Sequence, residues 1–171
     1  RFTILFLAPL GQDIIYAKDK NEIGRNFANK IWNAGRFLLM NRDQLGEAPK
    51  HDECNLDHLD LADRWILSRL HSTVMDLDEA MTKFEINKAT KDIYDFFWHD
   101  YCDWYVEMMK SRLYGDESAD VKQAIVARAL DIYDAALRLL HPIMPFVTEE
   151  LWQHIRERAP QTTIMLATMP E

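Results

Sequence analysis

The sequence of 171 residues has few of the features that mark several large classes of protein. Its two cysteines, Cys54 and Cys102, are too few for a disulfide framework and favour a reducing, cytoplasmic setting. The five glycines and six prolines are too few for a turn-rich β-sandwich or barrel. No apolar run approaches the ~20 residues that a membrane-spanning helix needs, so we expect no membrane contact.

Motifs of catalysis and metal binding are also missing. There is no glycine-rich phosphate loop, no GxSxG or HExxH motif, and no paired CxxC. No glutamate is followed three residues later by histidine, as a di-iron helical bundle requires. We therefore expect no catalytic residue, no metal ligand and no cofactor within this chain.

Two groups of side chains resemble metal ligands only weakly. One lies in the acidic segment 43–60, for which an exposed polar loop is the favoured interpretation; it contains His51, Asp52, Cys54, Asp57 and His58. The other is the dipeptide His99–Asp100, which some helical metal phosphohydrolases use. An ordinary helix face is the favoured interpretation of that pair, because the dipeptide lacks the upstream and downstream partners of a metal site.

Charge is distributed unevenly along the chain, whose net charge is −8. Residues 1–42 carry seven Lys and Arg against three acidic residues, whereas residues 43–171 carry thirteen against twenty-five. The acidic remainder disfavours a general nucleic-acid coat protein, but the basic first quarter permits local contact with a polyanion.

Apolar side chains recur at steps of three and four residues, which predicts helices almost throughout. We expect helices over about 21–41, from near 60, over about 87–114, over about 118–141, and after Pro145. Four helices of about 20 residues or more with short connections predict an all-α fold, an antiparallel helical bundle of about five helices. Segments 1–10 and 162–168 are expected to be short strands or extended tails.

The apolar stripes also predict which side chains face inward. Phe27, Ile31, Ala34 and Leu38 form the stripe of the first helix. The second helix is expected to bury Leu67, Leu70, Val74, Leu77, Met81 and Phe84. The third is expected to bury Ile93, Phe97, Trp104 and Met108. Three tryptophans are interpreted as packing residues, namely Trp65, Trp98 and Trp152.

The opposite flank of the first helix carries a combination of groups suited to single-stranded RNA. At about 100° per residue, Asn29, Asn33, Arg36 and Phe37 lie away from the apolar stripe. A ring stacks on a splayed base, an amide reads a base edge, and a guanidinium holds a base or a phosphate. From composition and periodicity alone, however, the favoured interpretation is that Phe37 packs under another helix and the polar groups are merely solvated.

The third helix carries three acidic side chains at helical spacing, Asp100, Asp103 and Glu107. This spacing is typical of a solvated or salt-bridged stripe.

Four segments in register resemble the anticodon-binding domain of class I aminoacyl-tRNA synthetases, and more narrowly that of the valyl-tRNA synthetases. The first helix of that domain resembles Arg25–Phe37, whose sequence is RNFANKIWNAGRF. The later segments are Asp63–Leu70 (DRWILSRL), Phe97–Glu107 (FWHDYCDWYVE) and Leu139–Trp152 (LLHPIMPFVTEELW). A tryptophan common before the last proline is Met169 here.

The resemblance implies a domain organisation within a longer protein. Residues 1–20 would connect to a catalytic domain, residues 21–158 would form the anticodon-binding bundle, and residues 159–171 would lead toward a coiled-coil arm. HIGH-like and KMSKS-like motifs are missing, and the first residue is Arg1, so we expect a piece that is inactive alone. The parent would use ATP and Mg²⁺ to load valine onto tRNA(Val), as a cytoplasmic monomer.

The resemblance also implies roles for individual residues. Anticodon contacts would come from Asn33, Arg36, Phe37, Val106 and Glu107, and contacts to the RNA backbone would come from Arg25 and Lys30. Three alternatives stay open: the same domain of an isoleucyl- or leucyl-tRNA synthetase, a metal phosphohydrolase that uses His99–Asp100, and a purely structural interaction domain.

Overall fold

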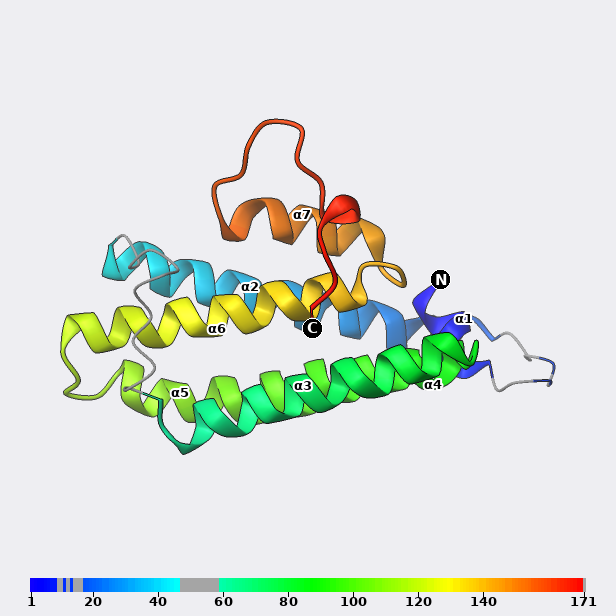
Figure 1. Cartoon of the computed structure of the whole chain (residues 1–171), viewed down its shortest axis with the longest axis horizontal. Coiled ribbons are helices and arrows are strands. Elements are labelled where there is room, and N and C mark those ends of the chain that lie inside the picture. The colour runs from blue at the N-terminus through cyan, green and yellow to red at the C-terminus, as the bar shows by residue number, and fades with distance from the viewer. Residues whose placement is uncertain (9–10, 12, 14–16, 47–58, 171) are drawn as a thin grey trace.

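The computed structural model describes residues 1–8, 11, 13, 17–46 and 59–170. All five expected helices are present, and the described residues contain no strand, which confirms the all-α bundle (Figure 1). The elements are α1 (Phe2–Leu7), the 3₁₀ turn η1 (Lys18–Lys20), α2 (Asn21–Leu45), α3 (Leu61–Thr82), α4 (Ile86–Asp95), the π-helix η4 (Phe96–Tyr105), α5 (Val106–Leu113), α6 (Ala119–Leu140), α7 (Pro145–Ile155) and the 3₁₀ turn η5 (Ile164–Leu166).

Local chemistry explains where several of these helices begin. The Asp60 side chain accepts from the Asp63 backbone N–H at 2.8 Å, and Asp63 accepts from the Asp60 N–H at 3.2 Å, which makes a capping box for α3. Ser118 caps α6 in a similar way through the backbone N–H of Val121. Pro145 occupies the first turn of α7, where its missing N–H costs nothing.

The expectation that residues 1–10 form a strand or an extended tail is wrong for the first part of that segment. Phe2–Leu7 form a short helix, because its apolar face docks onto the bundle instead of pairing with a strand. The ring of Phe2 lies 4.7 Å from that of Phe27, centroid to centroid. Asn87 of α4 donates to the backbone carbonyls of Leu5 and Phe6, which fixes the end of α1.

Helix α6 lies at the centre of the bundle. Fourteen of its 22 residues are buried. In Figure 1, α2 lies behind α6, the helices α3 and α4–η4–α5 lie below it, and α7 lies above. The core around α6 is aromatic: Tyr101 donates to the carbonyl of Ala129 at 2.7 Å, and Tyr133 donates to that of Ile31 at 2.9 Å. The long polar-tipped rings therefore tie α6 to η4 and to α2.

The π-helix corrects two predicted core residues. Trp104 is 58% exposed and Met108 is 41% exposed, whereas both were expected to face inward. Because a π-helix has more residues per turn than an α-helix, the apolar stripe continues through Tyr101 and Tyr105 instead. The predictions for Ile93 and Phe97, which precede or begin the wide turns, are confirmed by their full burial.

The end of α3 contains a second correction. Met81 is 39% exposed and Phe84 is 79% exposed. Helix α3 ends at Thr82, and Phe84 lies in the following turn with a φ of 58°, so the helical period no longer applies to it. The tryptophans expected to pack do so: Trp152 is buried, and Trp65 and Trp98 pack partly buried against the core.

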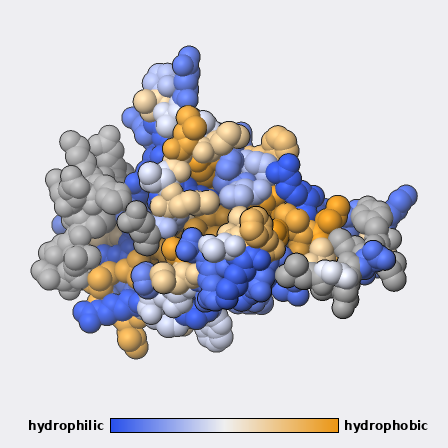
Figure 2. Space-filling view, turned by 45° about the vertical axis from the view of Figure 1, so that its right-hand side comes forward, coloured by the Kyte–Doolittle hydropathy of each residue, from blue (hydrophilic) through white to orange (hydrophobic). Residues whose placement is uncertain are grey.

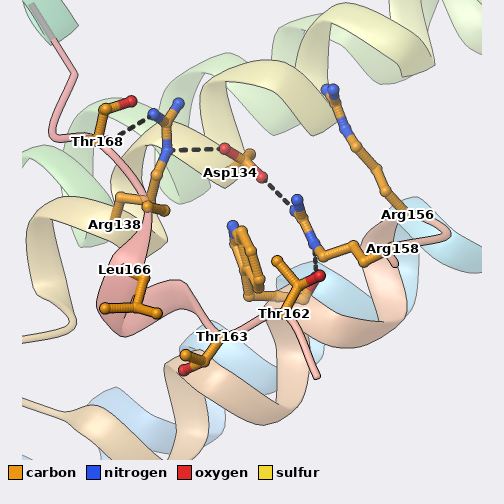
Figure 3. A pocket seen from close by; sticks show the side chains of 10 residues that line it. Asp134, Arg138, Arg156, Arg158, Thr162, Thr163, Leu166 and Thr168 are labelled. Atoms are coloured by element: carbon orange, nitrogen blue, oxygen red, sulfur yellow. Dashed lines mark hydrogen bonds and ion pairs between the residues drawn. The ribbon is translucent and has the colours of Figure 1, made fainter. Parts of the chain in front are cut away.

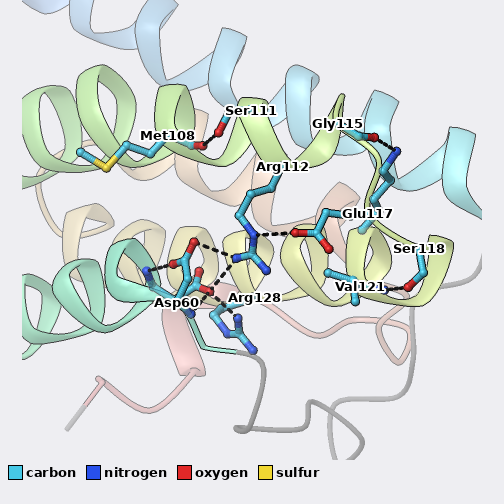
Figure 4. Close-up of polar contacts among 11 residues, drawn as sticks. Asp60, Met108, Ser111, Arg112, Gly115, Glu117, Ser118, Val121 and Arg128 are labelled. Carbon is cyan, nitrogen blue, oxygen red and sulfur yellow. Dashed lines mark hydrogen bonds and ion pairs between the residues drawn. The ribbon is translucent and has the colours of Figure 1, made fainter.

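A buried ionic network joins the N-terminus of α3 to α5 and α6 (Figure 4). Asp63 has a side chain only 3% exposed, and it accepts from Arg128 Nη1 at 2.8 Å and from the Tyr105 hydroxyl at 2.8 Å. Arg112 of α5 reaches Asp60 at 2.9 Å and Glu117 at 3.5 Å. The network holds three helices together at one end of the bundle.

The crossing of α2 and α6 requires glycine at position 35. A Cβ there would lie 2.6 Å from the Tyr133 hydroxyl and 3.0 Å from Leu151 Cδ2. Both neighbours are buried, so neither moves cheaply. We expect Gly35→Ala to lower the free energy of unfolding by about 1–3 kcal/mol, measured by urea denaturation, because overpacking forces the helices apart.

The Gly35→Ala experiment has an internal control. Tyr133→Phe removes the clashing hydroxyl, so the double variant should lose less stability than the sum of the two single losses. Strict additivity would show that the added methyl group does not press on the Tyr133 hydroxyl.

Apolar side chains remain on the surface in separate patches among hydrophilic ones (Figure 2). The most exposed large ones are Leu61, Phe84, Phe146 and Leu166, each at least 79% exposed. Within the described part of the chain, no helix has the length and hydropathy needed to cross a membrane.

Candidate nucleic-acid interface

The outer face of α2 presents polar side chains that the protein itself does not use. Asn29, Asn33 and Arg36 are exposed, and no side chain among these three has a hydrogen bond or ion pair with another described residue. They lie away from the buried stripe formed by Phe27, Ile31 and other core residues. The helical period of the sequence therefore predicted their exposure correctly. Two amides and a guanidinium are therefore available to a ligand.

The segment formed by η4 and α5 borders this face and runs parallel to α2. Lys30 Nζ lies 2.6 Å from Asp103 Oδ1 of η4, and Lys110 Nζ of α5 lies 5.3 Å from the centroid of the Phe37 ring. Both pairs have the same separation in sequence, so α2 runs in the same direction as η4–α5, as Figure 1 also shows. This register places Asn33 at the level of Val106, and we call the surface between the two pairs the α2–α5 groove.

Phe37 is more enclosed than the helical wheel implies. It is partly buried and packs against the core, while the Lys110 ammonium lies over its ring. Lys110 also pairs with Glu107 at 2.6 Å. An exposed carboxylate, a cation and an aromatic ring thus follow one another along the groove, held by charge and by the ring quadrupole.

Val106 and Glu107 of α5 have different environments. Val106 is 7% exposed, so little of its side chain is available to a ligand. Glu107 is exposed, and its carboxylate keeps acceptor capacity beyond its contact with Lys110.

The two basic residues assigned to the RNA backbone also differ. Arg25 is exposed, and among the residues that the structure describes its side chain pairs with Glu22 alone, at 3.0 Å. Lys30 is partly buried, is paired with Asp103, and lies 5.2 Å from the centroid of the Trp98 ring. A phosphate would have to compete with Asp103 for Lys30, whereas Arg25 is open to it.

The acidic stripe of η4 and α5 is salt-bridged, as its spacing predicts. Asp100 pairs with Arg69 at 2.8 Å, Asp103 pairs with Lys30, and Glu107 pairs with Lys110. The first two pairs fasten η4 to α3 on one side and to α2 on the other, whereas the third lies within α5.

The metal-ligand candidates receive no support. His99 contacts Asp103 at 3.3 Å, and no cluster of three or more potential ligands occurs in the residues that the structure describes. The candidate ligands within 51–58 lie outside those residues. Burial raises the pKa of the Cys102 thiol to about 12, so this cysteine stays protonated and inert.

Sequence reasoning missed Lys110 as a member of the groove. The available signal was its spacing of three residues from Glu107, which is typical of an ion pair on a helix. Its position over Phe37 depends on the packing of α5 beside α2, and that packing has no local signal in the sequence.

Comparison with known proteins identifies the domain. Residues 63–171 match the family described as the anticodon-binding domain of tRNA ligase. The chain belongs to this family. The α2–α5 groove lies only partly within the matched region, because α2 precedes residue 63 and α5 follows it.

The similar proteins include many valine–tRNA ligases. That of Chlorobaculum tepidum is 41% identical over 178 residues, which cover 100% of this chain and 20% of the relative. That of Thermotoga maritima is 44% identical over 171 residues, covering 100% and 18%. The anticodon-binding domain described here therefore spans about a fifth of the length of the relatives it matches.

A solved structure shares the fold. The LeuRS of Agrobacterium radiobacter K84, in a ternary complex with tRNA and LeuAMS, matches with a TM-score of 0.57 and 19% identity, covering 89% of this chain and 17% of that one. At this identity the likeness concerns the fold alone.

Proposed function

We propose that the α2–α5 groove binds the anticodon stem-loop of tRNA(Val), and that the chain serves this role within a valine–tRNA ligase. The observation that carries the proposal is the set of exposed, unpaired groups at Asn29, Asn33 and Arg36 beside the Phe37 ring. The similarity to valine–tRNA ligases over the whole chain supports valine over isoleucine or leucine.

Each group has a distinct task in this proposal. Asn33 reads a base edge through its amide, and Phe37 stacks on an unpaired base. Glu107 accepts from an exocyclic amino group and disfavours bases that lack one. Val106 supports the groove from below, since it is almost fully buried.

Basic side chains hold the RNA backbone. Arg36 and Arg25 contact phosphate or base without needing to leave a strong partner. A base that stacks on Phe37 takes the place of the Lys110 ammonium, which stays close enough to pair with phosphate. Lys30 contributes mainly through its positive charge and not through a direct contact, because its ammonium group is paired with Asp103.

The chemistry of aminoacylation belongs to the rest of the parent enzyme in this proposal. There a catalytic domain uses ATP and Mg²⁺ to load valine onto tRNA(Val) in the cytoplasm, with the enzyme acting as a monomer. The present chain reports the identity of the anticodon.

Competition among tRNAs tests the proposal. With labelled tRNA(Val) bound to this chain, unlabelled tRNA(Val) should compete better than tRNA(Ile) or tRNA(Leu), although binding is weak because most contacts lie elsewhere in the parent. A preference for tRNA(Ile) or tRNA(Leu) would assign the chain to the sister enzymes. A complete lack of RNA binding would favour a structural interaction domain.

Two single substitutions locate the binding surface. We expect Arg36→Ala and Asn33→Ala each to weaken binding of tRNA(Val) by about tenfold, because each removes a hydrogen bond that no other residue replaces. The matched control is Arg64→Ala, an exposed arginine on α3. Equal losses in Arg36→Ala and Arg64→Ala would show that only net charge matters.

A further inference from the structure

A second polar site lies on the other side of α6. A cavity of about 370 Å³ opens between the C-terminal half of α6, the end of α7 and the tail that follows it (Figure 3). Its lining includes Asp134 and Arg138 of α6, Trp152 of α7, and Arg156 and Arg158 beyond α7. The α2–α5 groove contributes no residue to this lining.

The cavity concentrates positive charge in an acidic chain. Three guanidiniums line it against one carboxylate, although the net charge of the chain is −8. Asp134 already receives two of them: Arg158 Nη2 lies 2.7 Å from one carboxylate oxygen and Arg138 Nε lies 2.8 Å from the other. Arg156 pairs with Asp131. Arg138 Nη1 also donates to the Thr168 carbonyl and Arg158 Nε to the Trp152 carbonyl, so both guanidiniums are held in fixed positions that face an oxyanion.

One buried donor in this lining, Trp152 Nε1, has no hydrogen-bond acceptor. Arg138 Nε is held by Asp134 at 2.8 Å, an ion-pair distance without the alignment of a hydrogen bond. Trp152 is 3% exposed, and the Arg158 guanidinium lies 3.2 Å from the centroid of its ring. A buried indole N–H without an acceptor is rare, so Trp152 in this lining indicates a missing acceptor.

We propose that this cavity is a phosphate-binding site, separate from the α2–α5 groove and independent of the function proposed for it. A phosphate carries several acceptor oxygens that point in different directions, which suits guanidinium donors from two elements better than a cation or an apolar ligand. The phosphate is either free in solution or part of an RNA backbone.

Spectroscopy of the tryptophan indoles tests the proposal on this chain. Inorganic phosphate is titrated at constant ionic strength against chloride, and the ¹H–¹⁵N indole resonances are followed, with that of Trp152 assigned through Trp152→Phe. We expect a saturable shift of the Trp152 resonance that the other four tryptophans do not share. A parallel titration with a short RNA duplex identifies the source: saturation by inorganic phosphate indicates a free anion, and saturation by RNA alone indicates a backbone phosphate. No shift with either ligand would overturn the proposal.

Substitutions with opposite expected signs separate binding from a structural role. Arg138→Gln should weaken phosphate binding by about tenfold or more, because a charge-assisted hydrogen bond is lost. Asp134→Asn should strengthen it, because the competing carboxylate loses its charge while the shape is kept. Arg64→Gln, which changes net charge equally at a distant exposed position, should leave binding unchanged.

Other results would contradict the site. Equal weakening by Arg138→Gln and Arg64→Gln would show that phosphate responds only to the net charge of the chain and not to this cavity. Weaker binding in a folded Asp134→Asn variant would show that the Asp134 carboxylate does not compete with phosphate for the arginines. If Asp134→Asn does not fold, Arg156→Gln replaces it, with weakened binding as the expected result and unchanged binding as the contradicting one.

Discussion

Replacing Asp63 by alanine should lower the free energy of unfolding by about 3–5 kcal/mol, the largest loss of stability expected from one substitution in this chain. The carboxylate is 3% exposed and holds Arg128, whose side chain is 7% exposed, together with the Tyr105 hydroxyl. Its removal leaves a buried guanidinium without its partner, and one nitrogen of that guanidinium, Nη2, already lacks a hydrogen bond. Urea denaturation followed by circular dichroism measures the loss.

Two further variants make the result specific. Asp78→Ala removes an exposed carboxylate from the same helix and should change the free energy of unfolding by less than about 0.5 kcal/mol. Replacing Asp63 and Arg128 together by apolar residues of similar volume should recover much of the loss, because no unpaired charge is then buried. A loss below about 1 kcal/mol in Asp63→Ala would mean that water reaches this network.

Replacing Phe37 by alanine should lower kcat/KM for tRNA charging in the full-length enzyme by roughly 5- to 150-fold. This range corresponds to the loss of one base–aromatic stack of about 1–3 kcal/mol. The effect depends on the function proposed for the α2–α5 groove. Aminoacylation with tRNA(Val) as the varied substrate measures it, and the rate of ATP–pyrophosphate exchange with valine should stay constant because that step needs no anticodon.

The control for Phe37 is another phenylalanine in the same bundle. Phe146 of α7 is 89% exposed and lies outside the groove, so Phe146→Ala should leave tRNA charging unchanged. Phe37→Tyr should keep most of the activity, since the ring is retained. Unchanged charging in Phe37→Ala would remove Phe37 from the set of anticodon contacts.

Stability must be measured beside activity for Phe37→Ala. The ring is partly buried against the core, so the variant also loses some packing. Loss of tRNA charging in a variant that is folded at the assay temperature is the expected result. Activity that returns fully on cooling would attribute the loss to unfolding.

The sequence determined the helices and one face of the candidate site. Apolar residues at steps of three and four fix the inner face of a regular helix, which is why Phe27, Ile31 and Leu38 were placed correctly without any structure. The same geometry put Asn33 and Arg36 in solvent. End signals are local as well: the capping box at Asp60 is formed by side chains and backbone within three residues.

Tertiary structure decided everything that depends on which helix lies beside which. The wide turns of η4 move Trp104 out of the core, because the large rings of Tyr101 and Tyr105 must reach partners on α6 and α3. The Lys110 ammonium reaches Phe37 only because α5 runs parallel to α2. The spacing of apolar residues along one helix determines the direction of each side chain around that helix axis. Contacts between helices depend on residues about 70 positions apart, and no pattern within one helix encodes them.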